Sequence, residues 1–144
     1  KCDGEPVFHS PEGEGSAPMK FTFLTLFPDM VEGYCNQSIV GRARQRGVIA
    51  VETRNPRDYS DNPHRKVDDT PYGGGAGMVL ACQPWDAAFR SLQPLAPGAR
   101  VLMPCPTGPR FDHAMALDLA QASQIVFLCG HYEGFDERIG QIIP

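Results

Sequence analysis

Segments typical of β-strands alternate with segments typical of α-helices along most of this 144-residue chain. The strands are expected at 20–27, 48–54, 100–103 and 124–129. The last of these is nearly all apolar, as expected of a strand in a sheet that is covered on both faces. The alternation predicts an α/β fold with a mainly parallel sheet and flanking helices.

Turn and capping residues mark the expected helices. Pro28 suits the first position of a helix, and Gly47 suits the position just after a helix over 38–46. A third helix is expected to begin at Pro84, and Asp112 is expected to cap a fourth. The third helix has apolar side chains on one face, namely Trp85, Ala88, Phe89 and Leu92.

Composition excludes several classes of protein. Hydrophobic residues make up 42% of the chain and the net charge is −4, which suits a packed core rather than a charge-driven disordered chain. No purely apolar run is long enough to cross a membrane, and no apolar targeting segment opens the sequence, so we expect a cytoplasmic protein. The 5 cysteines are widely spaced and odd in number, which predicts reduced, mostly buried thiols.

The start of the chain differs from the rest. Residues 1–18 contain one lysine against four acidic residues, are rich in Gly and Pro, and show no periodic apolar pattern. We therefore expect a disordered leader over 1–18 and a single domain over 19–144 that begins at Met19.

A glycine segment, residues 73–77, lies inside the polar stretch 55–78, which is long for a loop in a compact domain. Its glycines permit positive φ angles and let a ligand approach the backbone closely. The segment lacks the lysine of a phosphate-binding P-loop, and its register does not fit a dinucleotide-binding turn. A flexible turn is the structural alternative.

A second motif follows the apolar strand directly and runs from Gly130 to Arg138. Ligands of parallel sheets bind at the carboxyl ends of strands, where this motif and 104–108 are both expected. Gly130 would let a flat ligand approach the backbone. The structural alternative is an Asp-Glu-Arg helix start over 136–138 that caps itself and pairs across the turn.

Basic residues gather between Arg42 and Lys66, where seven stand against three acidic ones. A localised positive surface would suit a phosphate backbone, although such arginines more often form a solvated face. Tyr59 and Tyr72 lie close to this run, where they could stack on unpaired bases. Cys105 lies between two prolines, and we expect a packed, unreactive thiol.

Five motifs that occur in order resemble those of the bacterial tRNA (guanine-N1)-methyltransferase family, and the likeness runs from Met19 to the end of the chain. The motifs are Leu26-Phe27-Pro28-Asp29-Met30, Gly41-Arg42-Ala43, Pro56-Arg57-Asp58, the segment from His64 to Met78, and the segment from Cys129 to Arg138. One such short motif alone would carry little weight.

The resemblance implies a SPOUT methyltransferase fold with a deep trefoil knot, working as a homodimer. It also implies S-adenosyl-L-methionine as methyl donor and the guanine 3′ of the tRNA anticodon, guanine 37, as acceptor at N1; the sequence indicates no metal site and leaves any metal dependence open. By motif match, the donor-binding residues would be Met103, Pro104, Pro106, Gly130, Tyr132 and Glu133. The substrate-binding residues would be His64, Asp68, Tyr72, Gly73, Gly74, Gly75, Gly77 and Glu133.

Two departures from the family pattern qualify this assignment. Cys105-Pro106-Thr107-Gly108 stands where the family commonly has Ser-Pro-Gln-Gly, and we expect the backbone pocket to survive that exchange. The family continues past the position of Pro144 with a knot-closing segment, an aspartate base, an arginine and a helical tRNA-binding domain. We therefore expect the knot to be incomplete, and the 144-residue chain alone to bind the donor weakly and to be inactive.

The chemistry leaves some roles open. Guanine N1 carries a proton at neutral pH, so its methylation needs a base within hydrogen-bond reach. Asp68 and Glu133 are candidates for reading the guanine edge, and either could be that base, whereas the resemblance assigns proton removal to the aspartate beyond Pro144. Two rival functions are an RNA-binding α/β module without catalysis, using the arginines of 42–46, and a nucleotide-binding enzyme with a reactive Cys105.

Overall fold

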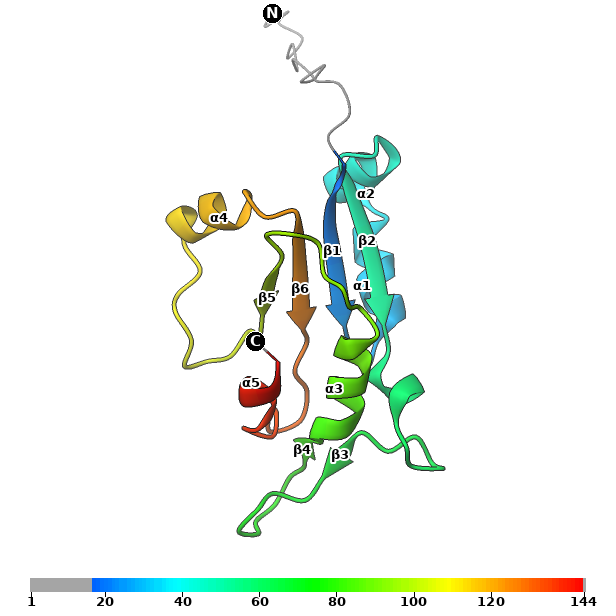
Figure 1. The fold of residues 1–144 in the computed structure, drawn as a ribbon, viewed down its shortest axis with the longest axis vertical. Helices are drawn as coiled ribbons and strands as arrows, with labels where there is room; N and C mark the ends of the chain where they lie inside the picture. The colour runs from blue at the N-terminus through cyan, green and yellow to red at the C-terminus, as the bar shows by residue number, and fades with distance from the viewer. Residues whose placement is uncertain (1–16, 144) are drawn as a thin grey trace, which may run out of the picture.

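The computed structural model describes residues 17–143, and its centre is a parallel sheet of four strands (Figure 1). The strands are β1 (Met19–Leu24), β2 (Ile49–Arg54), β5 (Arg100–Leu102) and β6 (Gln124–Leu128). They lie in the order β2-β1-β6-β5, with every neighbouring pair parallel. The predicted α/β fold with a mainly parallel sheet is confirmed.

Five α-helices and one 3-10 helix are described. They are α1 (Pro28–Cys35), α2 (Ser38–Gln45), α3 (Cys82–Arg90), α4 (His113–Leu119), α5 (Ile139–Ile142) and the 3-10 helix η1 (Pro56–Tyr59). Three predicted boundaries are confirmed, because Pro28 begins α1, Gly47 follows α2 at a φ of 69°, and the Asp112 carboxylate accepts from the Met115 N–H at 2.9 Å.

The third helix begins earlier than predicted, at Cys82 rather than at Pro84. Pro84 falls in the first turn, where the backbone N–H groups have no partner within the helix, so a proline there costs no helical hydrogen bond. The predicted apolar face of this helix is confirmed, since Trp85 is fully buried and Ala88 and Phe89 are buried beside it.

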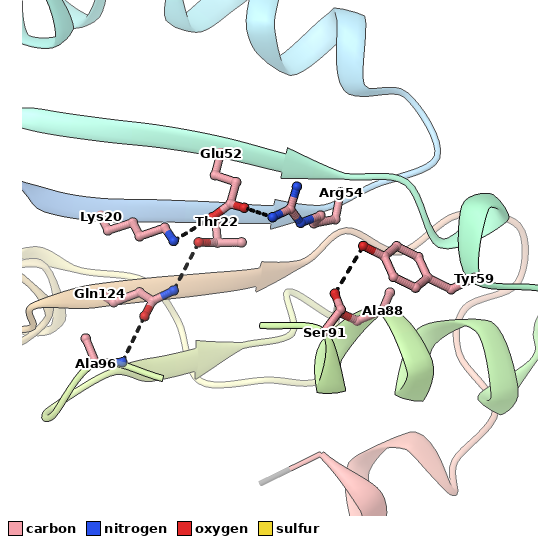
Figure 2. Close-up of polar contacts among 9 residues, drawn as sticks. All are labelled: Lys20, Thr22, Glu52, Arg54, Tyr59, Ala88, Ser91, Ala96 and Gln124. Atoms are coloured by element: carbon pink, nitrogen blue, oxygen red, sulfur yellow. Dashed lines mark hydrogen bonds and ion pairs between the residues drawn. The ribbon is translucent and has the colours of Figure 1, made fainter. Parts of the chain in front are cut away.

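The two faces of the sheet carry different layers. Helix α3 covers one face, where it packs against Leu24, Val126 and Leu128 in the hydrophobic core. Helix α1 lies on the opposite side of the sheet (Figures 1 and 2). On β1 and β6, Phe23 and Phe127 stack with their ring centroids 5.0 Å apart.

A buried polar network ties the segment before β5 to the middle of the sheet. Figure 2 shows the Gln124 amide between Thr22 and Ala96, with its Nε2 donating to the Thr22 hydroxyl at 3.1 Å. The Ala96 N–H donates to Gln124 Oε1 at 3.2 Å. Gln124 and Thr22 are both buried, so each polar group needs these partners.

The long polar stretch 55–78 contains more regular structure than expected. Besides η1, it holds β3 (Asp68–Asp69), which pairs antiparallel with β4 (Val79–Leu80). Two-residue strands are too short to show any periodicity in a sequence, which is why the pattern did not reveal them. The glycine segment is therefore the tip of a hairpin that extends beyond the carboxyl ends of the main strands (Figure 1).

Two further predictions concern the leader and the possibility of a membrane-spanning segment. The leader expected over 1–18 lies outside the described residues except for its last two positions, Ala17 and Pro18. Among residues 17–143, no helix is both long and apolar enough to cross a bilayer.

Candidate functional site

The two glycine-containing motifs lie side by side at the carboxyl ends of the strands. The Glu133 N–H donates to the carbonyl of Met78 at 3.0 Å, and the Leu80 N–H donates to the carbonyl of Gly134 at 2.8 Å. The Asp136 N–H donates back to the Leu80 carbonyl at 3.0 Å. These three hydrogen bonds join the β3–β4 hairpin to the turn over 130–138. Motifs about fifty residues apart therefore form one surface, which we call the joined surface.

Gly77 is where the hairpin and the turn approach most closely. A Cβ at this position would lie 2.6 Å from Cγ of Glu133, and the φ of 102° suits glycine alone. Tyr132 holds a φ of 57°, a conformation that non-glycine residues adopt mainly at functional or tightly held turns. The Glu133 side chain therefore packs directly against the backbone of Gly77, which only a glycine permits.

The turn is seated on the hydrophobic core. A Cβ at Gly130 would lie 3.2 Å from the Phe135 ring, and that ring meets Trp85 edge to face with centroids 4.7 Å apart. Trp85 is fully buried, and Phe135 packs against the core around it. The backbone at Gly130 consequently has little freedom to move.

Arg138 joins the two motifs through their side chains. Its Nε donates to Asp136 Oδ1 at 2.9 Å and its Nη2 to Asp136 Oδ2 at 2.5 Å. The same Nη2 donates to the Tyr72 hydroxyl at 3.0 Å. The hydrogen bonds from Arg138 lower the pKa of Asp136 from its ordinary 3.8 to about 2, and Asp136 in turn raises the pKa of Arg138. This pairing agrees with the structural alternative raised for the motif, an Asp-Glu-Arg helix start whose side chains pair across the turn.

A cavity of about 680 Å³ opens between the hairpin and the turn. It is lined by Pro71, Tyr72, Val79, Phe135, Asp136, Glu137 and Arg138. Only Tyr72 was proposed from the sequence as a site residue. The apolar Val79 and Phe135 carried a signal, because each is a large hydrophobic residue next to a polar, glycine-rich stretch.

An aromatic row continues the site toward β1. Phe27 follows β1, and its ring meets His131 edge-on at a centroid distance of 5.1 Å. His131 then meets Tyr132 at 4.6 Å. Phe27 is 44% exposed and Tyr132 45% exposed, so both rings are accessible to a planar ligand.

The loop after β5 reaches the same end of the sheet, because β5 and β6 are parallel neighbours. Residues 103–110 are all exposed. Cys105 belongs to them, so the expectation of a packed thiol is wrong; the loop leaves the sheet instead of folding back on it. Among the described residues, no hydrogen bond or ion pair joins this loop to the turn. Met103, Pro104 and Pro106 are thus near Gly130, Tyr132 and Glu133 by strand order alone.

The other described cysteines also depart from the prediction of mostly buried thiols. Cys35 is buried, whereas Cys82 and Cys129 are half-buried, and all of them are free of disulfides. Burial raises the pKa of all three thiols, which keeps them protonated.

The basic run does not form one surface. Helix α2, with Arg42 and Arg46 exposed on it, lies at the end of the sheet opposite the β3–β4 hairpin (Figure 1). Other members of the run are paired with acids: Arg44 with Glu32, Arg54 with Glu52, Arg65 with Asp58 and Lys66 with Asp69. The expected localised positive surface is therefore divided and partly neutralised.

Two further predicted contacts have different outcomes. Tyr59 packs against the core and its hydroxyl is hydrogen-bonded to Ser91 at 3.1 Å, so it is not free to stack on a base. His64 is exposed in the loop between η1 and β3, and no described contact joins it to the glycine segment. Asp68 is half-buried and pairs with Leu80, next to the joined surface. No group of three or more metal-ligating side chains occurs within the described part of the chain.

Comparison with known proteins identifies relatives of this chain. The family model described as tRNA (Guanine-1)-methyltransferase TrmD matches residues 19–143. A tRNA (guanine-N(1)-)-methyltransferase of Halalkalibacterium halodurans is 50% identical over 122 residues, which cover 84% of this chain and 50% of the relative. The enzyme of the same name from Staphylococcus carnosus is 50% identical over 121 residues, covering 84% of this chain and 49% of the relative.

A solved structure shows the same fold. The crystal structure of tRNA (m1G37) methyltransferase from Aquifex aeolicus superposes with a TM-score of 0.79 at 33% identity. The superposition covers 88% of this chain and 57% of that one. The predicted methyltransferase fold is thereby confirmed, and the chain spans about half the length of the curated relatives it matches.

Proposed function

Because this chain belongs to the tRNA (guanine-1)-methyltransferase family, we propose that its protein transfers a methyl group from S-adenosyl-L-methionine to N1 of guanine 37 in tRNA. The single observation that carries the proposal is the joining of the hairpin to the turn through Glu133, Leu80 and Asp136. This joining supports the proposal because the motif proposed for the substrate and the motif proposed for the donor then share one surface, as transfer between two bound molecules requires.

The residues at the strand ends fit the donor. Met103 is 39% exposed and stands with Pro104 and Pro106 at the end of β5, where proline carbonyls and apolar edges suit an adenosine. Gly130 and Tyr132 stand at the end of the neighbouring β6. Bound there, the donor supplies an activated methyl group, so no metal is needed to create an electrophile.

The acceptor side has its own polar groups. The glycine segment offers unsubstituted backbone to an unstacked guanine, and Glu133 and Asp68 offer carboxylate oxygens to its N–H edge. A carboxylate in hydrogen-bond reach of N1 would orient the base for attack. In the family resemblance, removal of the N1 proton belongs to an aspartate that follows the position of Pro144.

The remaining family properties are proposals of the same kind. We infer a cytoplasmic homodimer whose partner is the tRNA anticodon loop. Exposed apolar side chains on α1, with Met30 and Tyr34 both 73% accessible, are of the kind that a subunit interface covers. The trefoil knot and the inactivity of residues 1–144 alone stay predictions.

Methyl transfer to defined tRNAs tests the proposal. The intact protein is incubated with radiolabelled donor and with tRNA that carries either guanine or adenine at position 37. We expect label in N1-methylguanine with the first tRNA and none with the second. Tight tRNA binding without any transfer would overturn the proposal in favour of an RNA-binding module.

Paired variants connect the activity to the joined surface. Glu133→Gln should lower kcat/KM by about 10²-fold, because the carboxylate is lost from the acceptor side. Asp118→Asn removes an exposed carboxylate on α4, paired with Arg100 away from the site, and should keep the activity unchanged. Equal activity of the two variants would contradict the assignment of Glu133.

A further inference from the structure

Tyr72 occupies an unusual position for an aromatic residue next to a flexible segment. It immediately precedes the glycine segment and is 81% exposed, so burial contributes little to holding it. Gly73, Gly74, Gly75 and Gly77 all have positive φ angles. Such glycines have many accessible conformations, so the segment needs an external restraint to keep one of them.

Arg138 supplies contacts of that kind. Its guanidinium donates to the Tyr72 hydroxyl at 3.0 Å, and its Cζ lies 5.3 Å from the centre of the Tyr72 ring. One side chain thus holds both the polar tip and the face of the tyrosine. The contact spans 66 residues of sequence and lies on the wall of the 680 Å³ cavity.

Asp136 fixes the guanidinium from the other side. Its carboxylate side chain is only 8% exposed, accepts from both Nε and Nη2 of Arg138, and also accepts from the Arg138 backbone N–H at 3.0 Å. The Cys82 thiol at the start of α3 adds a small contribution to the lowered pKa of the same carboxylate. The arginine is therefore anchored to the turn. The backbone hydrogen bonds between the turn and the hairpin lie at Met78 and Leu80, after the glycine segment in the sequence.

We propose that Arg138 is a positioning residue: anchored by Asp136, it holds Tyr72 and through it orders the glycine segment for the acceptor nucleotide. The inference deepens the proposed function and rests on it for the identity of the ligand. Ordering the segment in advance removes an entropic cost that would otherwise fall on acceptor binding. Arg138 itself touches no reacting atom in this account.

Four variants of the intact protein test the contact as a double-mutant cycle. They are Arg138→Gln, Tyr72→Phe, the two combined, and Arg138→Lys. We expect Arg138→Gln to raise the KM for tRNA by about tenfold, the cost of losing a charge-assisted hydrogen bond, with the KM for the donor unchanged within about twofold. The combined variant should be no worse than Arg138→Gln alone, because both changes break the same contact.

Arg138→Lys separates positioning from charge. A lysine keeps the positive charge beside Asp136 but lacks the planar fork that reaches two partners at once, so we expect little recovery. Full recovery by lysine, or additive effects in the combined variant, would overturn the proposal. Arg90→Gln is the matched control, since Arg90 on α3 also pairs with a nearby aspartate, donating from Nε to both oxygens of Asp86, and lies outside the cavity.

Hydrogen exchange gives a readout that needs no activity. The Gly74 N–H, bonded to the carbonyl of Pro71 at 3.1 Å, should exchange about tenfold faster in Arg138→Gln than in the unaltered protein. The core amides of β6 should exchange at unchanged rates. Acceleration of both alike would show a general loss of stability and overturn the proposal. If no methyl transfer occurs in any protein, the proposed function fails while the exchange result still decides whether Arg138 orders the segment.

Discussion

Two loops leave the sheet at the carboxyl ends of neighbouring strands, and the contacts that hold them differ in number and range. The turn after β6 is hydrogen-bonded to the β3–β4 hairpin through Glu133 and Leu80, and its Phe135 ring packs on buried Trp85. The loop after β5 is exposed throughout 103–110, and its described internal contacts are short-range, such as the Gly108 N–H to the Cys105 carbonyl at 3.3 Å.

This difference divides the residues proposed for the donor. Gly130, Tyr132 and Glu133 lie in the turn, which is hydrogen-bonded to the hairpin proposed for the acceptor. Met103 and the two prolines lie on a loop that follows β5 and is exposed. Substitutions in the joined surface should therefore disturb stability and the binding of both ligands, whereas substitutions in the loop after β5 should affect donor binding alone.

The largest expected effect comes from breaking the joined surface at Gly77. Gly77→Ala puts a methyl group 2.6 Å from Cγ of Glu133 in a backbone conformation with a φ of 102°. We expect a loss of about 2–3 kcal/mol in the free energy of unfolding, from strain and displacement of the turn. Methyl transfer should fall by about 10²-fold or more. Urea unfolding and initial rates measure the two losses.

Gly74→Ala is the matched control for Gly77→Ala. Its φ is also positive, at 80°, but an added Cβ would meet nothing within 4 Å. We expect only the cost of the backbone conformation, about 1 kcal/mol. A Gly74→Ala variant as unstable as Gly77→Ala would show that close approach to Glu133 is not what Gly77 provides.

The next effect tests what holds the segment before β5, and with it the strand from which the loop over 103–110 leaves the sheet. Gln124→Leu fills a similar volume but removes the amide that bonds Thr22 and Ala96 (Figure 2). Two polar groups then lose a partner, which should cost about 2 kcal/mol of stability. Donor binding should weaken while acceptor binding stays the same, as calorimetry with each ligand would reveal. Equal weakening of both would remove the distinction between the two loops.

The pH dependence of stability tests the role of Asp136 in the turn. Its pKa is lowered in the folded protein to about 2, against 3.8 unfolded, so its contribution to stability is complete above pH 4. That contribution is lost as the pH falls from about 4 to about 2. Asp136→Asn should therefore make the stability less steeply dependent on pH in this window, and Arg138→Gln should do the same. Denaturant midpoints measured across the window decide the point; an unchanged slope in both variants would contradict it.

The smallest effect concerns the exposed thiol. Cys105 should react with a small alkylating reagent well before Cys35, which is buried and whose pKa is raised by burial. Because Cys105 stands between Pro104 and Pro106, bound donor should slow its modification by several-fold. Mass spectrometry of the labelled peptides follows both rates. Protection by tRNA instead of donor would place this loop on the acceptor side.

The sequence predicted the elements whose signals are local. Pro28 and Gly47 mark helix ends through their backbone conformation and Asp112 through its capping side chain. The run in β6 is apolar because the strand is buried inside the sheet. The contacts that build the site depend on residues far apart, such as Tyr72 with Arg138, and no periodicity encodes such a pair. Cys105 was predicted to be packed but is exposed, because its exposure depends on where the loop leaves the sheet, which local sequence does not encode.

The charge pattern misled for a related reason. A count over Arg42 to Lys66 treats the run as continuous, whereas the fold sends α2 to one end of the sheet and the loop after η1 to the other (Figure 1). Partners such as Glu32, which neutralises Arg44, lie outside the counted run. Sequence order alone could not show either effect.

The central claim is that the glycine segment and Glu133 receive the acceptor guanine beside the donor-binding residues of the turn after β6. Photo-crosslinking with a tRNA that carries 6-thioguanosine at position 37 tests this directly, because the base reacts only with residues that it contacts. We predict crosslinks within 72–78 and at Glu133 of the intact protein. Crosslinks confined to α2, at the far end of the sheet, would contradict the account.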